Sequence, residues 1–151
     1  MRTFKSVGEL AALQGQPIGT SDWVTITQEA VNLFADATGD HQWIHVDRER
    51  AAKGPFGTTI AHGYMTLSLL PSLMQQIYTV EGVKMGINYG LNKVRFPAPV
   101  PVGSRVRAQT AVADVADLGD GAYQLTMSTT VEVEGSPKPA CVAESVVRYL
   151  T

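Results

Sequence analysis

Residues 61–82 read AHGYMTLSLLPSLMQQIYTVEG, and the expected architecture can be built outward from this segment. Its large apolar side chains surround most of a helical wheel: Met65, Leu67, Leu69, Leu70, Leu73, Met74 and Ile77. A helix that is apolar on nearly every side is a buried helix. Pro71 lies inside it, and a proline in a helix interior produces a kink. The pattern predicts one long buried helix, bent near Pro71.

The segments after Gly82 are expected to be β-strands, because they are rich in Val, Thr and Tyr and alternate between apolar and polar residues. They cover residues 83–90, 91–100, 104–119, 122–135 and 139–150. One face of the fourth segment carries Tyr123, Leu125, Met127, Thr129, Val131 and Val133. Residues 119–121 (GDG) and 135–137 (GSP) are typical of hairpin turns. Helices followed by long antiparallel strands indicate an α+β domain, with one apolar helix packed on a strongly twisted sheet.

Composition narrows the class of protein. The chain has 151 residues, 44% of them hydrophobic and 17% charged, with a net charge of −2. We expect one domain over residues 1–151. No basic run suggests a nucleic-acid partner, and the apolar segments are too short to span a bilayer. Residues 1–10 lack the apolar core of a signal peptide. These features favour a cytoplasmic protein.

Two further expectations follow from the same pattern. The single cysteine, Cys141, lies in a strand-like segment, so it is expected to be a buried structural thiol and not a nucleophile. One sheet around one helix leaves a face or an edge uncovered. A homodimer that continues the sheet would cover it.

Upstream of the buried helix, residues 27–40 (TQEAVNLFADATGD) predict another helix. One face of it is apolar: Ala30, Leu33, Phe34 and Ala37. Thr27 is expected to cap its start and Gly39 to end it, which places Asp40 in a loop just beyond the helix. A second short helix is expected over residues 47–53 with Asp47 as its N-cap. Residues 54–59 are expected to form a loop.

Four polar side chains gather in residues 40–47: Asp40, His41, His45 and Asp47. Asp47 is best explained as the N-cap, and His41 is expected to face solvent. Asp40 and His45 are five positions apart, a spacing that fits neither one helical face nor one strand face. We therefore expect both on a loop, turned toward a common cleft, where they could act as general acid and base. From spacing alone, a capping aspartate and a structural histidine are an equally open reading.

A zinc site built from Asp40, His41, His45 and His62 is a weaker alternative. Zinc sites usually show a tight ligand pair, such as a helical H-E-x-x-H or a C-x-x-C. A regular helix around His41 and His45 is doubtful so close to Gly39.

The start of the buried helix, Ile60-Ala61-His62-Gly63, offers a complementary group. The first N–H groups of a helix have no partner within the helix, and that end carries a partial positive charge. Gly63 lacks a side chain, so a carbonyl oxygen could approach its N–H closely. A backbone donor of this kind stabilises a developing oxyanion by about 3–4 kcal/mol.

The motifs FADATGDHQWIHVD (34–47) and GPFGTTIAHGYMTLSLL (54–70), with YGLNKVRFPAPVPVGSRVRA (89–108), resemble the MaoC-like, (R)-specific enoyl-CoA hydratase family, also called hydratase 2. The resemblance extends over about residues 20–150. It implies a hot-dog fold, in which a long central helix is wrapped by a curved antiparallel sheet, usually as a dimer. It also implies reversible syn addition of water to a trans-2-enoyl-CoA, giving the (3R)-3-hydroxyacyl-CoA, in fatty-acid metabolism.

By this resemblance, Asp40 and His45 are the catalytic pair that holds the attacking water, with Asp40 as the base. The N–H of Gly63 would bind the thioester oxygen. The substrate is an acyl-CoA or acyl-carrier-protein thioester, and no metal or redox cofactor is implied. The expected substrate contacts are Ile60, Ala61, His62, Gly63, Ile87, Asn88, Tyr89, Lys93 and Arg95. Lys93 and Arg95 could bind the coenzyme A phosphates or be solvated strand charges.

The sequence departs from the family pattern in one place, because Gln42-Trp43 replaces the usual Asn-Pro. The bulk of Trp43 puts the preferred acyl chain length in question. Two other functions stay open: a hot-dog acyl-CoA thioesterase, whose carboxylate would be aimed at the thioester carbon, and a non-catalytic acyl-CoA-binding module. A 3-hydroxyacyl-thioester dehydratase performs the same reaction in reverse, and the sequence does not separate it from the hydratase.

Overall fold

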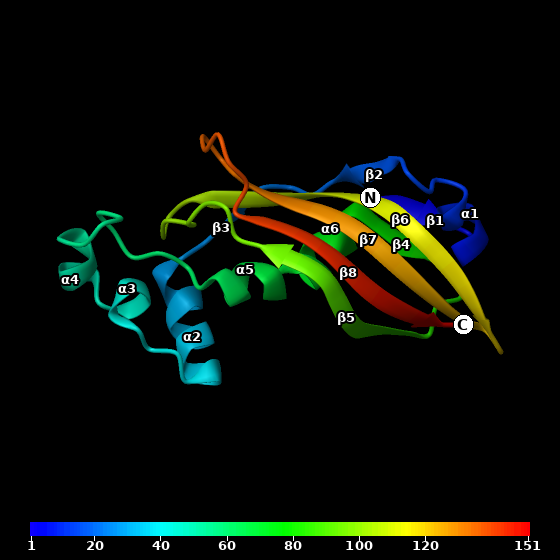
Figure 1. Cartoon of the computed structure of the whole chain (residues 1–151), viewed down its shortest axis with the longest axis horizontal. Coiled ribbons are helices and arrows are strands. Elements are labelled where there is room, and N and C mark those ends of the chain that lie inside the picture. The colour runs from blue at the N-terminus through cyan, green and yellow to red at the C-terminus, as the bar shows by residue number, and fades with distance from the viewer.

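Four long antiparallel strands form most of the main sheet in the computed structural model, which describes residues 1–151 (Figure 1). They are β5 (Met85–Arg95), β6 (Arg105–Gly119), β7 (Ala122–Val133) and β8 (Cys141–Leu150). Their order is β6-β7-β8-β5, and the short strands β2 (Pro17–Thr20) and β3 (Val24–Thr25) pair with β6. β5 is therefore an edge strand of the sheet.

The strand predictions are confirmed except at β5. Residues 83–90 and 91–100 were expected to be two strands, but the structure has one strand, Met85–Arg95. It ends just before Pro97 and Pro99, which lack the N–H needed to continue a ladder. The expected turn at residues 119–121 is confirmed, since all three residues have positive φ angles.

The sequence pattern did not predict several short elements. These are β1 (Arg2–Phe4), α1 (Val7–Ala11), β2, β3 and β4 (Tyr78–Val80). β1 and β4 pair in parallel as a separate two-stranded sheet. No helix in the structure has the length and apolar character needed to cross a membrane.

The central helix consists of two segments, α5 (Gly63–Ser68) and α6 (Leu70–Ile77). The prediction of one continuous helix was wrong in this detail. The chain keeps right-handed helical dihedral angles at Leu69, between the two segments. Pro71 lies in the first turn of α6, where its missing N–H leaves no hydrogen bond unmade. The polypeptide thus accommodates Pro71 by starting a new helix.

One hydrophobic core joins the central helix to the sheet. Leu70, Leu73 and Ile77 of α6 are buried in it. The predicted inner face of β7 is confirmed, because all of its members except the half-buried Tyr123 are buried: Leu125, Met127, Thr129, Val131 and Val133. Cys141 is buried as expected, and burial raises the pKa of its thiol to about 11.

Three helices gather at one end of the molecule, beyond the long strands (Figure 1): α2 (Gln28–Thr38), α3 (Trp43–Val46) and α4 (Arg48–Ala52). The predicted caps are confirmed, since Thr27 accepts a bond from the Ala30 N–H and Asp47 accepts one from the Arg50 N–H. The predicted apolar face of α2 is only partly right. Val31 and Ala35 are buried, whereas Leu33 and Ala37 are exposed, because α2 packs at the end of the fold.

Candidate active site

Asp40 is placed by the end of α2. Gly39 adopts a left-handed conformation, φ 79°, and its N–H donates to the Ala35 carbonyl at 2.8 Å. The chain leaves the helix axis at this residue, as predicted. The Asp40 carboxylate then accepts a hydrogen bond from the Gln42 N–H at 3.3 Å. Its side chain is 53% exposed, so it can meet both water and a substrate.

His45 lies on the single helical turn α3, so the prediction of a loop at this residue was wrong. Two contacts from other elements hold the turn. Gln28 Nε2 donates to the His45 carbonyl at 2.7 Å, and Gln28 Oε1 accepts from Thr59 at 2.6 Å. Gln28 is thus a supporting residue that sequence reasoning missed. Nothing in its local context separates it from an ordinary first-turn helix residue.

The protonation of His45 follows from its surroundings. Its ring is buried, and its Nδ1 lies 2.7 Å from the Ile60 carbonyl oxygen. A carbonyl oxygen only accepts, so Nδ1 carries the hydrogen and Nε2 presents a lone pair in the neutral ring. Burial lowers the pKa of His45, and the neighbouring His62 lowers it further, against the opposing effects of the Ile60 bond and the Asp40 charge. His45 is therefore neutral at pH 7, with Nε2 as an acceptor.

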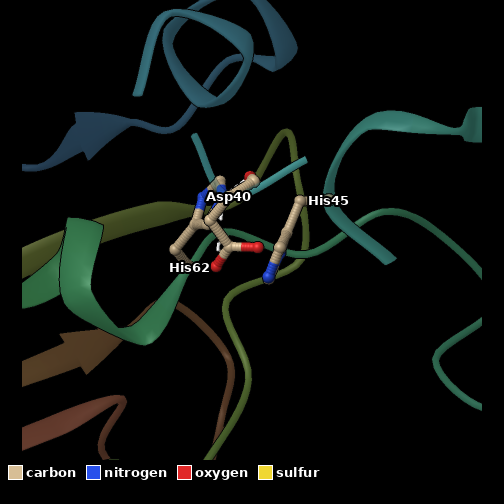
Figure 2. Close-up of side chains that lie close together, drawn as sticks. All are labelled: Asp40, His45 and His62. Atoms are coloured by element: carbon tan, nitrogen blue, oxygen red, sulfur yellow. Dashed lines mark hydrogen bonds and ion pairs between the residues drawn. The ribbon is translucent and has the colours of Figure 1, made fainter. Parts of the chain in front are cut away.

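His62 joins the two halves of the site (Figure 2). It precedes α5, is 3% exposed, and its Nε2–H donates to the backbone carbonyl of Asp40 at 2.9 Å. Its ring stacks on His45 with centroids 3.8 Å apart and lies 4.9 Å from the ring of Phe34. The buried Nδ1 of His62 has no hydrogen-bond partner. His62 thereby fixes Asp40 beside His45.

Asp40, His45 and His62 lie close enough to raise the metal alternative, with one polar atom from each within 4.8 Å of the others. The two imidazole planes are stacked at 24° to each other. Ring nitrogens bind zinc in the plane of the ring at about 2.0–2.1 Å. Planes this close to parallel meet too far from the two rings for one ion to bind both nitrogens at that distance unless a ring rotated. The arrangement therefore suits acid–base chemistry better than zinc.

The remaining histidine lies apart from this cluster. His41 is exposed and its Nε2 lies 2.9 Å from Asp36. The hydrogen bond with Asp36 raises the pKa of His41. The expectation that His41 faces solvent is confirmed.

The Ile60–Gly63 segment passes beside the histidines. Ile60 and Ala61 are buried, and Ile60 supplies the carbonyl that orients His45. Gly63 begins α5, and its N–H makes no hydrogen bond within the protein. A side-chain carbon added to Gly63 would lie 3.1 Å from the ring of Phe96. Only glycine fits here without displacing that ring.

The expected substrate residues on β5 are distributed along an exposed strand and do not form one cluster. Asn88 and Tyr89 line a cavity of about 650 Å³ between the central helix and strands β5 and β8, but Ile87 does not. Lys93 and Arg95 are exposed, and Arg95 donates to the adjacent Val94 carbonyl. Their contact with coenzyme A phosphates stays a prediction.

Comparisons with known proteins agree on one family. A family model described as "MaoC like domain" matches residues 9–134. The 3-hydroxyacyl-thioester dehydratase Z of Mycobacterium tuberculosis is 76% identical over 150 residues, 99% of each chain. Nodulation protein N of Rhizobium leguminosarum is 44% identical over 140 residues, 91% of this chain and 87% of that protein. The solved (R)-hydratase of A. caviae has 28% identity and a TM-score of 0.70, over 89% of this chain and 94% of that one.

Proposed function

The chain belongs to the MaoC-like dehydratase family, and from this premise we propose that it is a hydro-lyase acting on acyl thioesters. It adds water reversibly to a trans-2-enoyl thioester, giving the (3R)-3-hydroxyacyl thioester of fatty-acid metabolism. The observation that carries the proposal is the pairing of the Asp40 carboxylate with a neutral His45 whose Nδ1–H is held by Ile60. Coenzyme A or an acyl carrier protein bears the acyl group.

The roles of the pair follow from their available atoms. A single water molecule can donate one hydrogen bond to the Asp40 carboxylate and a second hydrogen bond to His45 Nε2. Asp40 removes a proton as the water oxygen bonds to C3, and the electrons of the C2–C3 double bond move toward the thioester oxygen. His45 Nε2 has no proton to give, so the protonated Asp40 returns its proton to C2. One group acting from one side produces syn addition, and such acid–base catalysis contributes about 10²–10⁴-fold.

The free N–H of Gly63 is proposed to stabilise the negative charge on the thioester oxygen. Gly63 begins α5 directly after His62, so the segment that holds Asp40 through His62 also positions this donor. The cavity between the central helix and strands β5 and β8 starts at Leu67, one helical turn beyond Gly63. Its lining is mostly apolar. A thioester bound at Gly63 would direct its acyl chain into that cavity.

The direction of the reaction in the cell depends on the concentrations of enoyl and hydroxyacyl thioesters. The 76% identical relative is named a dehydratase, and the solved relative is named a hydratase. Both names describe the same equilibrium approached from opposite sides. The Asp40–His45 site serves either direction, since each step above is reversible.

The experiment that tests this function is an assay with crotonyl-CoA, following loss of the enoyl absorbance and release of free thiol in parallel. We expect hydration without thiol release. Thiol release without hydration would instead identify a thioesterase. Absence of both signals with short and long enoyl-CoA substrates would leave the binding module as the function.

We also propose that the protein is a homodimer that joins two copies at β5. The backbone groups along the outer side of this edge strand have no strand partner. The strand also presents exposed apolar side chains: Met85, Ile87, Tyr89 and Leu91. Long exposed edges of this kind are usually covered in native proteins. The cytoplasmic location and the lack of a metal or redox cofactor stay predictions.

A further inference from the structure

The cavity beside the central helix has a defined direction. The Phe96 ring that packs on Gly63 follows the end of β5, so the catalytic site lies near that end of the strand. Pairing of β5 with β8 places Leu91 opposite Ser145, toward the catalytic site, and Gly86 opposite Tyr149, away from it. All four residues line the cavity. The cavity therefore runs along the helix from Leu67 near the site to a distant end.

Two tyrosines stand at the distant end. Tyr78 follows α6 and Tyr149 lies near the end of β8, and both line the cavity. Their hydroxyl oxygens are 2.8 Å apart. Burial raises the pKa of both hydroxyls, so both remain protonated, and one donates to the other. This hydrogen bond ties the helix to the sheet across the end of the cavity.

Neighbouring groups limit how far the two rings can move. Phe4 packs edge-on against Tyr78 with ring centroids 6.2 Å apart. A side-chain carbon added to Gly86 would lie 3.3 Å from the Tyr149 ring, so that ring already lies close to the β5 backbone. Tyr78 is 7% exposed. The pair is a supported wall, unlike the exposed side chains on the outer edge of β5.

We propose that the Tyr78–Tyr149 pair is the end wall of the acyl-binding cavity and sets the longest acyl chain that the enzyme accepts. The inference rests on the proposed function, since it identifies the cavity as the site of the acyl chain. It assigns the enzyme to medium-chain enoyl thioesters, because a four-carbon chain would leave most of the cavity unfilled.

The dimensions give the expected limit. Leu67 and Tyr78 are eleven residues apart, about 16 Å along a helix at 1.5 Å per residue. An extended alkyl chain advances by somewhat less than a C–C bond, about 1.5 Å, for each carbon, so the cavity holds on the order of ten carbons. Each methylene buried there improves binding about fourfold. The value of kcat/KM should rise with chain length until the wall is reached and then fall.

The test compares kcat/KM for trans-2-enoyl-CoA substrates of roughly 4 to 16 carbons, in the wild type and in variants of the wall. Tyr149→Ala opens the end, so the ratio of the longest to the shortest substrate should increase at least tenfold. Tyr149→Phe keeps the ring and should keep the wild-type limit. Tyr123→Ala is the matched control, because Tyr123 pairs with Tyr149 across the sheet but does not line the cavity.

A second variant keeps the proposal testable if Tyr149→Ala does not fold. Ser145 shares the inward face of β8 with Tyr149 and lies nearer the site, so Ser145→Leu fills the cavity. It should lower the same ratio about tenfold. An unchanged ratio in Ser145→Leu or Tyr149→Ala, or an equal shift in Tyr123→Ala, would overturn the proposal. If crotonyl-CoA is hydrated but kcat/KM does not vary with acyl chain length, only the end-wall proposal is overturned. If no enoyl-CoA of any chain length is hydrated, the proposed function is overturned too.

Discussion

At the scale of single residues, His45 and His62 form a stacked pair in which each ring has a different partner. The Nδ1–H of His45 is held by Ile60, and the Nε2–H of His62 is held by the Asp40 carbonyl. Two cationic rings 3.8 Å apart would repel each other strongly, which favours a neutral His45. This arrangement supports the proposal that Asp40 is the group that moves the proton.

Replacing either member of the pair should remove most of the activity while the fold is kept. Asp40→Asn can hold water but cannot take its proton, so kcat should fall about 10²–10⁴-fold. His45→Gln should also lower kcat by orders of magnitude, because the amide cannot reproduce the position of Nε2. Steady-state kinetics and circular dichroism check both. His41→Gln is the control and should keep kcat within about twofold, since His41 lies outside the site; a fully active Asp40→Asn would contradict the assignment.

The pH profile should reveal the neutral state of His45. Its pKa is lowered mainly by burial, so the neutral ring persists below 6.5, the ordinary value for histidine. As the pH falls, kcat/KM should decline only after the pH has passed below 6.5, the ordinary pKa of histidine. The profile is measured with crotonyl-CoA at low substrate concentration. A decline as pH rises from 6.5 toward 8 would instead identify His45 as a cationic acid.

At the scale of elements, helix ends and one short helical turn position the proposed catalytic groups. The left-handed turn at Gly39 directs Asp40 away from α2, and His62 joins that turn to the start of α5. The α3 turn carries His45 and is held by Gln28. Each proposed catalytic side chain thus lies on a short segment anchored by hydrogen bonds to a neighbouring element.

Gly39→Ala tests this placement. A residue with a Cβ at φ 79° should destabilise the fold by about 1–2 kcal/mol and shift Asp40, lowering kcat about tenfold. Gly39→Asn should be milder, because asparagine tolerates the left-handed region. The matched control is Gly15→Ala, which has a φ of 80° and lies between α1 and β2, away from the site. Steady-state kinetics and urea unfolding are measured for all variants. Equal losses of kcat in Gly39→Ala and Gly15→Ala would contradict the role of Gly39 in placing Asp40.

Local signals explain which elements were predictable. The caps at Thr27, Gly39 and Asp47 depend on hydrogen bonds within a few residues, so the sequence pattern predicted them correctly. The α3 turn depends on Gln28, which is distant in sequence, and it was missed. The same reason applies to the partner of His62. Its bond to the Asp40 carbonyl joins residues 22 positions apart and leaves no periodic pattern.

At the scale of the whole molecule, the exposed β5 edge is the feature that one chain leaves unexplained. β5 also forms one wall of the proposed acyl cavity, so a partner at this edge would lie close to the proposed substrate site. The α+β class and the presence of long antiparallel strands were predictable from period-two alternation, whereas the pairing of β8 with β5 was not. The short β1–β4 sheet was not, because three-residue strands show no period.

Light scattering should show a species of about twice the chain mass of 16.2 kDa. Ile87→Lys places a charge on the β5 edge and should shift the species toward the monomer. Val142→Lys is the control, because Val142 is similarly exposed on β8, an interior strand, and should leave the dimer intact. A wild-type protein that remains monomeric at assay concentrations would contradict the homodimer.

The most direct test of the central claim is the stereochemistry of hydration. Crotonyl-CoA is hydrated in D₂O, and the configurations at C2 and C3 of the product are determined by NMR and chiral chromatography. Because Asp40 is proposed to take a proton from water and return it on the same side, we predict deuterium and hydroxyl added to the same face, and the similarity to (R)-hydratases predicts the (3R) configuration. Addition to opposite faces would contradict the proposed role of Asp40, and a (3S) product would contradict the proposed (3R) specificity.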